Sequence, residues 1–310
     1  MSTLRELKTR IGSVASTQKT TSAMKMISSS KMRKATGQLQ RLSPYRHMVQ
    51  HVISHLLVTD QQFDSPLIAE REVQRVALVV FGSDDGLCGG FNVNIFKQVL
   101  TTIQQVRKQY GSQVGITIVP VGKKMTKAVE KIVGKDIQME KVALNTRSGS
   151  EELYEFTDLM KTRFLERVFD RVEMLYMHFI STGKQVFARE QLLPVSYQGL
   201  AENVDPRAAN SPCLFEPDAN TIFNTVLPLH IKSMLQDVFI QSAASEQSAR
   251  VMRCRRRATM PRSCSTSCSW STINCVSRAS PPSCSTSWAA RWNAKRNVKK
   301  IREYRLYYEH

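Results

Sequence analysis

Apolar residues spaced alternately three and four apart open the chain, and this spacing is typical of a coiled-coil helix. Polar or small residues interrupt the series from Gln18 to Ser28, and it becomes apolar again from Met32 to Leu42. Its members are Leu4, Leu7, Ile11, Val14, Gln18, Thr21, Lys25, Ser28, Met32, Ala35, Leu39 and Leu42. We predict a helix of about 55 residues, roughly 80 Å long at the usual rise. Pro44 either kinks this helix or begins a new segment.

Between residues 70 and 210 the pattern changes to short apolar runs separated by amphipathic stretches. Short apolar runs bounded by polar sequence predict strands, whereas apolar residues three or four apart predict helices. The predicted strands are Val76–Phe81, Gly115–Val121, Val172–Phe179 and Gln185–Leu193, and the predicted helices are Ile95–Tyr110, Lys124–Ile132 and Glu151–Val168. This order predicts an α/β domain whose helices cover a mixed or mainly parallel sheet.

The formal charge of +18 on these 310 residues is concentrated at the two ends. Residues 1–50 hold ten bases and one acid, residues 51–252 hold 21 bases and 23 acids, and residues 253–310 hold thirteen bases and two acids. Basic ends indicate an acidic partner, such as nucleic acid, anionic lipid or an acidic protein surface, or else a solvated helix face. No stretch is apolar enough to span a membrane, and charged sequence follows Met1, so we expect neither an integral membrane protein nor a secreted one.

A glycine-rich sequence, SDDGLCGGFNVN, follows the first predicted strand, where a phosphate-binding loop would lie. It lacks the Gly-Lys-Ser/Thr ending of a Walker loop and the spacing of a dinucleotide fingerprint. Asp84 and Asp85 would repel a phosphate, and the sequence implies no His beside Cys88. We therefore predict no catalysis, no cofactor and no metal, and a structural turn. Its glycines are Gly86, Gly89 and Gly90.

Three separated motifs resemble one family, the gamma subunit of F-type ATP synthase. The first is STQKTTSAMKM, followed by KMRKA, in the N-terminal helix. The second is SDDGLCGGFNVNI, which is similar to the family's SDRGLCGGFN turn, with Asp85 standing where the family usually has Arg. The third runs from Phe215 to Met252, and its SAASEQSARVM is especially close. The resemblance covers residues 1–252.

The resemblance implies both a fold and a role. An N-terminal helix over residues 1–58 and a C-terminal helix over 215–252 are expected to form a long antiparallel coiled coil, with a Rossmann-like α/β domain inserted over 70–210. The family's gamma subunit is a non-catalytic rotor shaft inside the ring of alpha and beta subunits. It rests on the epsilon subunit and the membrane rotor ring, and it couples proton flow to ATP synthesis. The resemblance implies a peripheral protein on the cytoplasmic face of a bacterial inner membrane, with no small-molecule substrate and no nucleic acid.

The polar middle of the first helix is the expected contact with the alpha-beta ring. Small hydroxyls and flexible methionines suit contact with a changing surface, although the same composition fits a helix whose polar face meets water. The family's beta subunits present an acidic loop to the shaft, which would give the cations of this helix a partner. The expected contact residues are Lys8, Arg10, Lys19, Met24, Lys25, Met26, Lys31, Arg33 and Lys34.

Residues 253–310 form an aberrant basic tail rich in Ser, Cys and Arg. They hold all three Trp and five of the seven Cys, residues 247–302 contain no acid, and residues 236–305 contain no Leu. Prolines argue against one continuous helix here, so we expect the C-terminal helix to be truncated near Met252. These prolines are Pro261, Pro281 and Pro282.

A frameshift accounts for this composition. A typical family stretch, Glu-Leu-Leu-Asp-Glu-Leu, spells Ser-Cys-Ser-Thr-Ser-Cys when suitable codons are read one base later, and this is Ser263–Cys268. Another, Glu-Leu-Leu-Asp-Ile-Val-Gly, gives Ser283–Ala289 in the same way. We infer a change of reading frame close to Met252 and Arg253.

Two other interpretations of the tail are a zinc site and a nucleic-acid-binding segment. Cys264 and Cys268 have no second close pair, and the tail has no His before His310, which argues against zinc. The runs RCRRR and KRNVKK, with Trp for stacking, would suit RNA, but neither interpretation accounts for the missing Leu and acids. The alternative function is a coiled-coil protein that binds nucleic acid through its basic ends, which a steep salt dependence would reveal.

Overall fold

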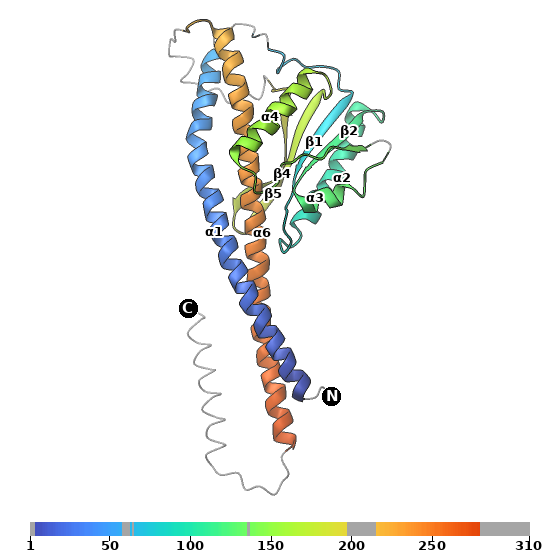
Figure 1. Ribbon diagram of the computed structural model, residues 1–310, viewed down its shortest axis with the longest axis vertical. Coiled ribbons are helices and arrows are strands. Elements are labelled where there is room, and N and C mark those ends of the chain that lie inside the picture. Colours follow the sequence, from blue (N-terminus) through green and yellow to red (C-terminus); the bar gives the residue numbers. More distant parts are fainter. Residues whose placement is uncertain (1–3, 58–62, 64, 135–136, 197–214, 280–310) are drawn as a thin grey trace. The chain divides into compact units, whose positions relative to one another are not determined.

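The computed structural model describes residues 4–57, 63, 65–134, 137–196 and 215–279, with side chains throughout these ranges except at Leu4, Leu7 and 258–279. The chain divides into two compact units, one of residues 1–18 and 259–310 and the other of residues 19–258. The larger unit contains the sheet, its covering helices and most of both long helices (Figure 1).

A five-stranded mixed sheet forms the centre of the α/β domain. Its strands lie in the order β3-β2-β1-β4-β5, with β1 to β4 parallel and β5 antiparallel to β4. Their bounds are β1 Arg75–Phe81, β2 Gly115–Val121, β3 Ile137–Met139, β4 Arg171–Ser181 and β5 Lys184–Leu193. The predicted mixed or mainly parallel sheet is confirmed, with the hairpin of β4 and β5 closing one edge.

Helices cover both faces of this sheet. Alternate side chains of a strand point to opposite faces, and the even-numbered apolar residues of β1 pack with α2 and α3, whereas its odd-numbered ones pack with α4 and the two long helices. The covering helices are α2 (Phe91–Tyr110), α3 (Lys123–Val129) and α4 (Ser150–Leu165). Every residue of β1 after Arg75 is buried, which explains why this strand is a continuous apolar run.

Two long helices pack antiparallel within the larger unit. Their bounds are α1 (Leu4–Leu57) and α6 (Ala219–Ala279). Ala35 of α1 lies in one apolar cluster with Ile240 and Ala244 of α6, and farther along α1 Arg46 forms an ion pair with Asp237. As the residue number rises in α1 it falls in α6, so the predicted antiparallel pairing is confirmed.

The predicted seam of α1 is largely its buried face. Thr21 and Ser28 are buried, and the same seven-residue spacing continues to Val49 and Leu56. Lys25 also falls on the predicted seam but is exposed. The smaller seam residues on either side of it, Thr21 and Ser28, are the buried ones, so the long side chain of Lys25 can extend into water.

Pro44 lies inside α1 without ending it. A proline removes one hydrogen bond of the helix, whose acceptor four residues earlier would be the carbonyl of Gln40. Both residues are exposed, so water can satisfy that carbonyl. The helix is therefore one element, and no new segment begins at Pro44.

Within the larger unit α6 is buried on nearly all sides, because it lies between α1 and the sheet (Figure 1). The Ser245 hydroxyl donates to the carbonyl of Met177 at 2.7 Å, and the Ser248 hydroxyl donates to the carbonyl of Thr182 at 2.6 Å. These bonds tie the helix directly to β4 and to the hairpin turn that follows it. Small serine and alanine side chains allow the close approach that the bonds require.

The end of α6 differs from the prediction. We expected the C-terminal helix to stop near Met252, with prolines preventing its continuation, but α6 runs to Ala279 and contains Pro261. One proline removes a single hydrogen bond and can bend a helix without ending it. Pro281 and Pro282 lie outside the described residues.

Several element boundaries also differ. Helix α2 begins at Phe91, earlier than predicted, because Asn92 in its first turn donates to the Ser83 hydroxyl at 2.7 Å and accepts from the Ser83 N–H at 3.1 Å. Helices α3 and α4 each end three residues before the predicted end. Strand β3 is not predicted at all, because three half-exposed or exposed residues at a sheet edge carry no periodic pattern.

Candidate partner interface

Most of the predicted contact residues of α1 lie on its water-facing surface. The exposed ones are Lys8, Arg10, Lys19, Lys25, Met26, Lys31, Arg33 and Lys34. Met24 is half-buried, whereas 70% of the surface of Met26 is exposed. Lys8 and Arg10 belong to the smaller unit, so the larger unit brings together the members from Lys19 onward.

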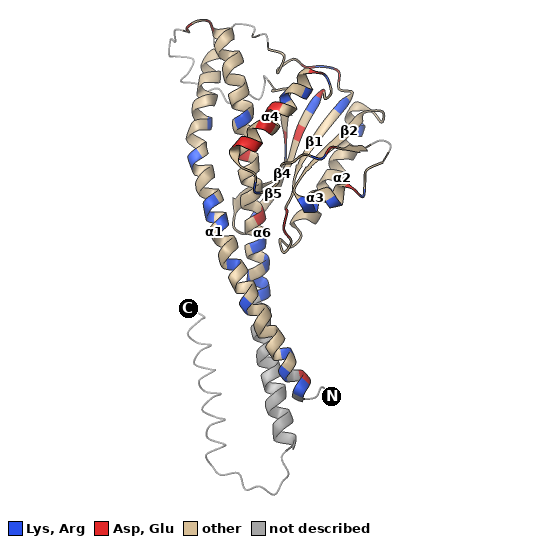
Figure 2. Cartoon of the chain, in the orientation of Figure 1, with Lys and Arg blue, Asp and Glu red and all other residues tan. Residues whose placement is uncertain are grey.

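The exposed cations follow from the local sequence. Residues 7–59 contain no Asp or Glu, so no carboxylate within this stretch of α1 can pair with them. The face toward α6 carries small buried residues such as Thr21 and Ser28, and the long basic side chains project from the other faces. Figure 2 shows Lys and Arg on both helices where they leave the sheet.

A second group of cations lies on α6. Arg253 and the run Arg255–Arg257 are exposed, whereas Cys254 between them is buried. The antiparallel register, continued at about 1.5 Å per residue, places these arginines beside the stretch of α1 around Lys25. The composition after Met252 predicts an aberrant tail, so these arginines are not among the predicted surface residues. The cationic collar consists of Lys19, Lys25, Lys31, Arg33, Lys34, Arg253, Arg255, Arg256 and Arg257.

The glycine-rich turn, residues 83–90, lies against α6 next to the collar. Arg250 is 5% exposed, and its guanidinium donates to the Glu246 carboxylate at 2.5 Å and to the carbonyl of Gly86 at 3.2 Å. Burial raises the pKa of Glu246; Asp84 and Asp85 raise it further, and Arg250 opposes the rise. Arg250, which is held by its ion pair with Glu246, therefore joins α6 to the turn through the carbonyl of Gly86.

Asp84 connects the same turn with the start of α3 and with a neighbouring loop. One carboxylate oxygen accepts from the N–H of Lys123 at 2.9 Å, and the other accepts from the N–H and the hydroxyl of Thr146 at 3.0 Å and 2.6 Å. Burial alone would raise the pKa of Asp84, but the hydrogen bonds from Thr146 and Lys123 outweigh it and hold the pKa below its usual value. Asp85 is exposed instead and pairs with Arg147 at 2.7 Å.

The three glycines of the turn have different environments. Gly89 has a φ of +65°, a conformation that favours glycine, and a Cβ there would lie 3.9 Å from the Arg253 side chain. Gly90 precedes α2 with a φ of −83°, and Gly86 supplies the carbonyl that Arg250 binds. The left-handed conformation of this turn thus lies at Gly89 and at Leu87, whose φ is +64°.

Cys88 is held in this turn by neutral polar groups. Its sulfur lies 3.6 Å from the Ser83 hydroxyl and 3.5 Å from the Asn92 amide nitrogen. Neither group is a base that could generate a thiolate. The contacts fit a residue that fills the inside of the turn, where it is buried.

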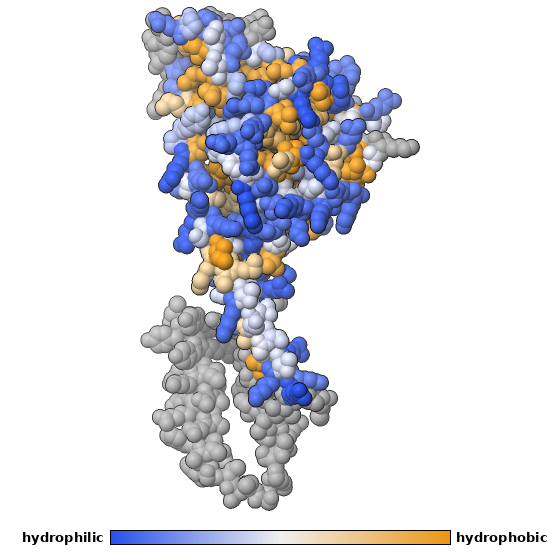
Figure 3. Space-filling model, in the orientation of Figure 1, coloured by the Kyte–Doolittle hydropathy of each residue, from blue (hydrophilic) through white to orange (hydrophobic). Residues whose placement is uncertain are grey.

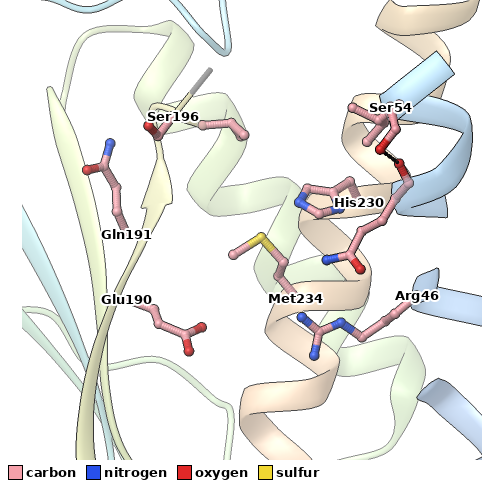
Figure 4. Close-up of a pocket in the computed structure, with 10 residues that line it drawn as sticks. Arg46, Ser54, Glu190, Gln191, Ser196, His230 and Met234 are labelled. Carbon is pink, nitrogen blue, oxygen red and sulfur yellow. Dashed lines mark hydrogen bonds between the residues drawn. The ribbon is translucent and has the colours of Figure 1, made fainter. Parts of the chain in front are cut away.

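A cavity of about 280 Å³ lies between the two long helices and β5 (Figure 4). His230, which is 5% exposed, points into it, and Arg46 and Glu190 line it from α1 and β5. Burial and the charge of Arg46 lower the pKa of His230 to about 4, so its ring is neutral at pH 7. Among the described residues no three His, Cys, Asp or Glu side chains gather as metal ligands.

Polar side chains dominate the visible surface, with smaller apolar areas between them (Figure 3). The exposed apolar residues on the polar middle of α1 include Met26 and Ile27. None of the helices in the described ranges is both long and apolar enough to cross a lipid bilayer. The surface that stands out chemically is therefore the cationic collar, with the glycine-rich turn beside it.

Comparison with known proteins identifies the family. A family model described as ATP synthase matches residues 3–259. The ATP synthase gamma chain of Bacteroides fragilis is 36% identical over 252 residues, which is 81% of this chain and 86% of that relative. The gamma chain of Cupriavidus pinatubonensis is 32% identical over 253 residues, again 81% of this chain and 86% of the relative.

Solved structures share the fold. The rotor of the Euglena gracilis mitochondrial ATP synthase matches 89% of this chain and 98% of its own chain, with a TM-score of 0.58 and 14% identity. A structure of the central stalk and c-ring of the Tetrahymena thermophila mitochondrial ATP synthase matches 76% of this chain and 98% of its own, with a TM-score of 0.53 and 22% identity.

An α/β domain mounted on an antiparallel pair of long helices is thus the architecture of a stalk subunit of rotary ATP synthases. The sequence matches make the assignment specific: the chain belongs to the ATP synthase gamma chain family. It is the non-catalytic subunit that forms the central stalk of the rotor in F-type ATP synthase. The family and the rotor role implied by the three sequence motifs are confirmed.

Proposed function

We propose that the α1 part of the cationic collar, Lys19, Lys25, Lys31, Arg33 and Lys34, is the surface through which this gamma subunit contacts the ring of alpha and beta subunits. The observation that carries the proposal is the concentration of exposed cations on α1, without a neutralising acid in residues 7–59. Exposed ion pairs contribute about 0–1 kcal/mol each. A shaft that must move past three subunits needs many such weak contacts rather than a few strong ones.

The proposal includes the other contacts of a rotor. The shaft rests on the epsilon subunit and on the membrane rotor ring, and its rotation couples proton flow to ATP synthesis in the alpha-beta ring. We place the subunit on the cytoplasmic face of a bacterial inner membrane, as a peripheral component. Bacterial gamma chains at 32–36% identity support this placement.

Reconstitution with alpha and beta subunits tests the collar. The charge reversals Lys25→Glu, Lys31→Glu and Lys34→Glu, combined in one chain, should weaken assembly and reduce ATP-driven rotation. The matched control reverses Lys124 and Lys127, two exposed lysines of the α/β domain, and should rotate like the unmodified chain. Circular dichroism checks that both variants keep their helix content. Normal assembly and torque in the collar variant would refute the proposed contact.

A further inference from the structure

We propose that the cavity between α1, α6 and β5 binds a small zwitterion, and specifically an apolar α-amino acid. Its volume of about 280 Å³ lies near the lower end of the range for ligand sites, which suits a small molecule. None of the residues that line it belongs to the cationic collar. The site is therefore independent of the proposed contact with the alpha-beta ring.

Three elements supply the polar groups of this cavity. Arg46, Gln50 and Ser54 follow one another at intervals of four residues on α1, so they share one face of that helix. His230 comes from α6, and Glu190 comes from β5 on the other side (Figure 4). All of these residues belong to the larger unit. The fold therefore brings polar groups from three distant parts of the sequence around one space.

His230 offers this space a buried polar group that the fold does not pair. The residue is 5% exposed, and its ring points into the cavity (Figure 4). Among the described residues, no group forms a hydrogen bond with either ring nitrogen. The neutral ring has one N–H donor and one acceptor nitrogen. Because an unpaired buried polar group is costly, a ligand that supplies the missing hydrogen bond gains affinity from it.

Opposite charges lie on the two sides of the cavity. Figure 4 shows Arg46 on one side and Glu190 on the other. One nitrogen of Arg46 pairs with Asp237, which leaves further N–H groups of the guanidinium for a second acceptor. The Glu190 carboxylate accepts from the neutral Tyr176 hydroxyl at 2.7 Å, and no Lys or Arg in the described ranges forms an ion pair with it. A molecule with a carboxylate at one end and an ammonium group at the other complements both sides.

Apolar side chains form much of the remaining wall. They are Ile53, Val195 and Met234. An aliphatic ligand side chain would bury its surface against them. In the bound amino acid, the carboxylate accepts from Arg46 and from the His230 N–H, and the ammonium group donates to Glu190. Leucine combines these features in a molecule of suitable size.

Saturation-transfer NMR with L-leucine tests the site on the full chain, because the method detects weak binding through the methyl signals of the ligand. We expect saturable binding. Two analogues have a similar shape but lack one charge each: isocaproate has no ammonium group, and isoamylamine has no carboxylate. Each should bind about tenfold more weakly than leucine, because the charge-assisted hydrogen bonds at one end are lost.

The substitution Glu190→Gln should weaken leucine binding about tenfold and remove the preference for leucine over isocaproate. The glutamine carbonyl can still accept from Tyr176, so the fold should be retained, which circular dichroism checks. The matched control is Glu155→Gln, which changes an exposed carboxylate on α4 and should bind leucine like the unmodified chain.

Three results would overturn the proposal. Without saturation transfer to leucine, the cavity holds solvent alone. Equal leucine binding by the Glu190→Gln variant and the unmodified chain would place the ligand elsewhere on the protein. Equal affinities for leucine and either analogue would show that the site does not recognise a zwitterion.

Discussion

Two adjacent aspartates of the glycine-rich turn have different roles, although the sequence presents them as a pair. The Asp84 carboxylate accepts three hydrogen bonds, two of them from backbone N–H groups at the start of α3 and in the loop at Thr146. Replacing Asp84 with Ala should lower the free energy of unfolding by about 1–3 kcal/mol, because the N–H groups of Lys123 and Thr146 lose their partner. Urea unfolding followed by circular dichroism measures the change.

Asp85→Ala is the matched control for this prediction. The Asp85 side chain makes an ion pair with Arg147 in which both partners are largely exposed. Such pairs contribute little, so we expect a stability close to that of the unmodified chain. Equal effects of the two substitutions would show that the hydrogen bonds of Asp84 do not hold the loops together.

His230 should make the stability of the protein depend on pH. The pKa of its buried ring is about 4 in the folded chain, against about 6.5 in an unfolded one. Between these values the unfolded chain binds a proton that the folded chain does not, so stability falls as the pH drops from about 6.5 to about 4. The expected loss is about 3 kcal/mol by pH 4.

Urea unfolding at pH 7 and at pH 4.5 measures this dependence, with His230→Gln as the comparison. The variant lacks the titrating ring, so it should lose less stability over the same interval. The charged groups that line the cavity are Arg46 and Glu190, and Arg46 pairs with Asp237; all three are unchanged in the variant. Parallel losses in both proteins would assign the pH effect to other groups.

At the scale of the element, α1 depends on a row of buried positions that runs through the larger unit. Leu56 is fully buried in the core that α1 shares with α6 and the sheet. Truncation to Ala should cost about 2–5 kcal/mol, from lost burial and the cavity left behind. Met48→Ala, at a position that is 66% exposed, should change the stability by no more than about 0.5 kcal/mol. Comparable losses in thermal unfolding would contradict the packing described here.

Elements with strong periodicity could be predicted from the sequence, and those governed by local side-chain bonds could not. The strand over Val76–Phe81 is predicted because it is a continuous apolar run, and the long N-terminal helix is predicted because its apolar positions repeat. The start of α2 is missed because Asn92 looks like a loop residue until its bonds to Ser83 are known. The continuation of α6 through Pro261 is missed because one proline does not decide the end of a helix.

In the candidate site, too, some features could be predicted from the sequence and others could not. Exposure of the α1 cations could be anticipated, because they alternate with small residues that face the other helix. The bonds of Asp84 to Lys123 and Thr146 and the bond of Arg250 to the carbonyl of Gly86 could not, because each joins residues that are far apart in the sequence and that only the fold brings together. The α6 arginines of the collar could not be predicted as surface residues, because the unusual composition there indicated a change of reading frame instead.

At the scale of the whole molecule, the composition after Met252 predicts a defect in the shaft. No Leu occurs in residues 236–305, whereas coiled-coil seams are usually built from large aliphatic residues. Ile11 and Val14 of α1 are half-buried as the chain stands. We predict that restoring one base near codon 252 opens an acidic, Leu-rich frame, and that the restored chain develops more torque in reconstituted ATP-driven rotation.

The nucleotide sequence around codons 248–256 tests the first half of this prediction directly. If neither alternative frame encodes an amphipathic helix, the change of frame did not occur. Rotation of the two chains with the same alpha and beta subunits tests the second half. Equal torque and equal proton-driven synthesis would show that the residues after Met252 serve the shaft as they are.

The bonds from Ser245 to Met177 of β4 and from Ser248 to Thr182 in the turn after β4 hold α6 directly against the sheet. The α/β domain should therefore rotate together with the helix pair as one rigid body. A fluorescent label or a bead attached at the exposed hairpin turn near Gly183 would report the angle of the adjoining shaft without slipping. A single-molecule recording from that position would measure the angular steps of the motor itself, rather than the swing of a loosely tethered domain.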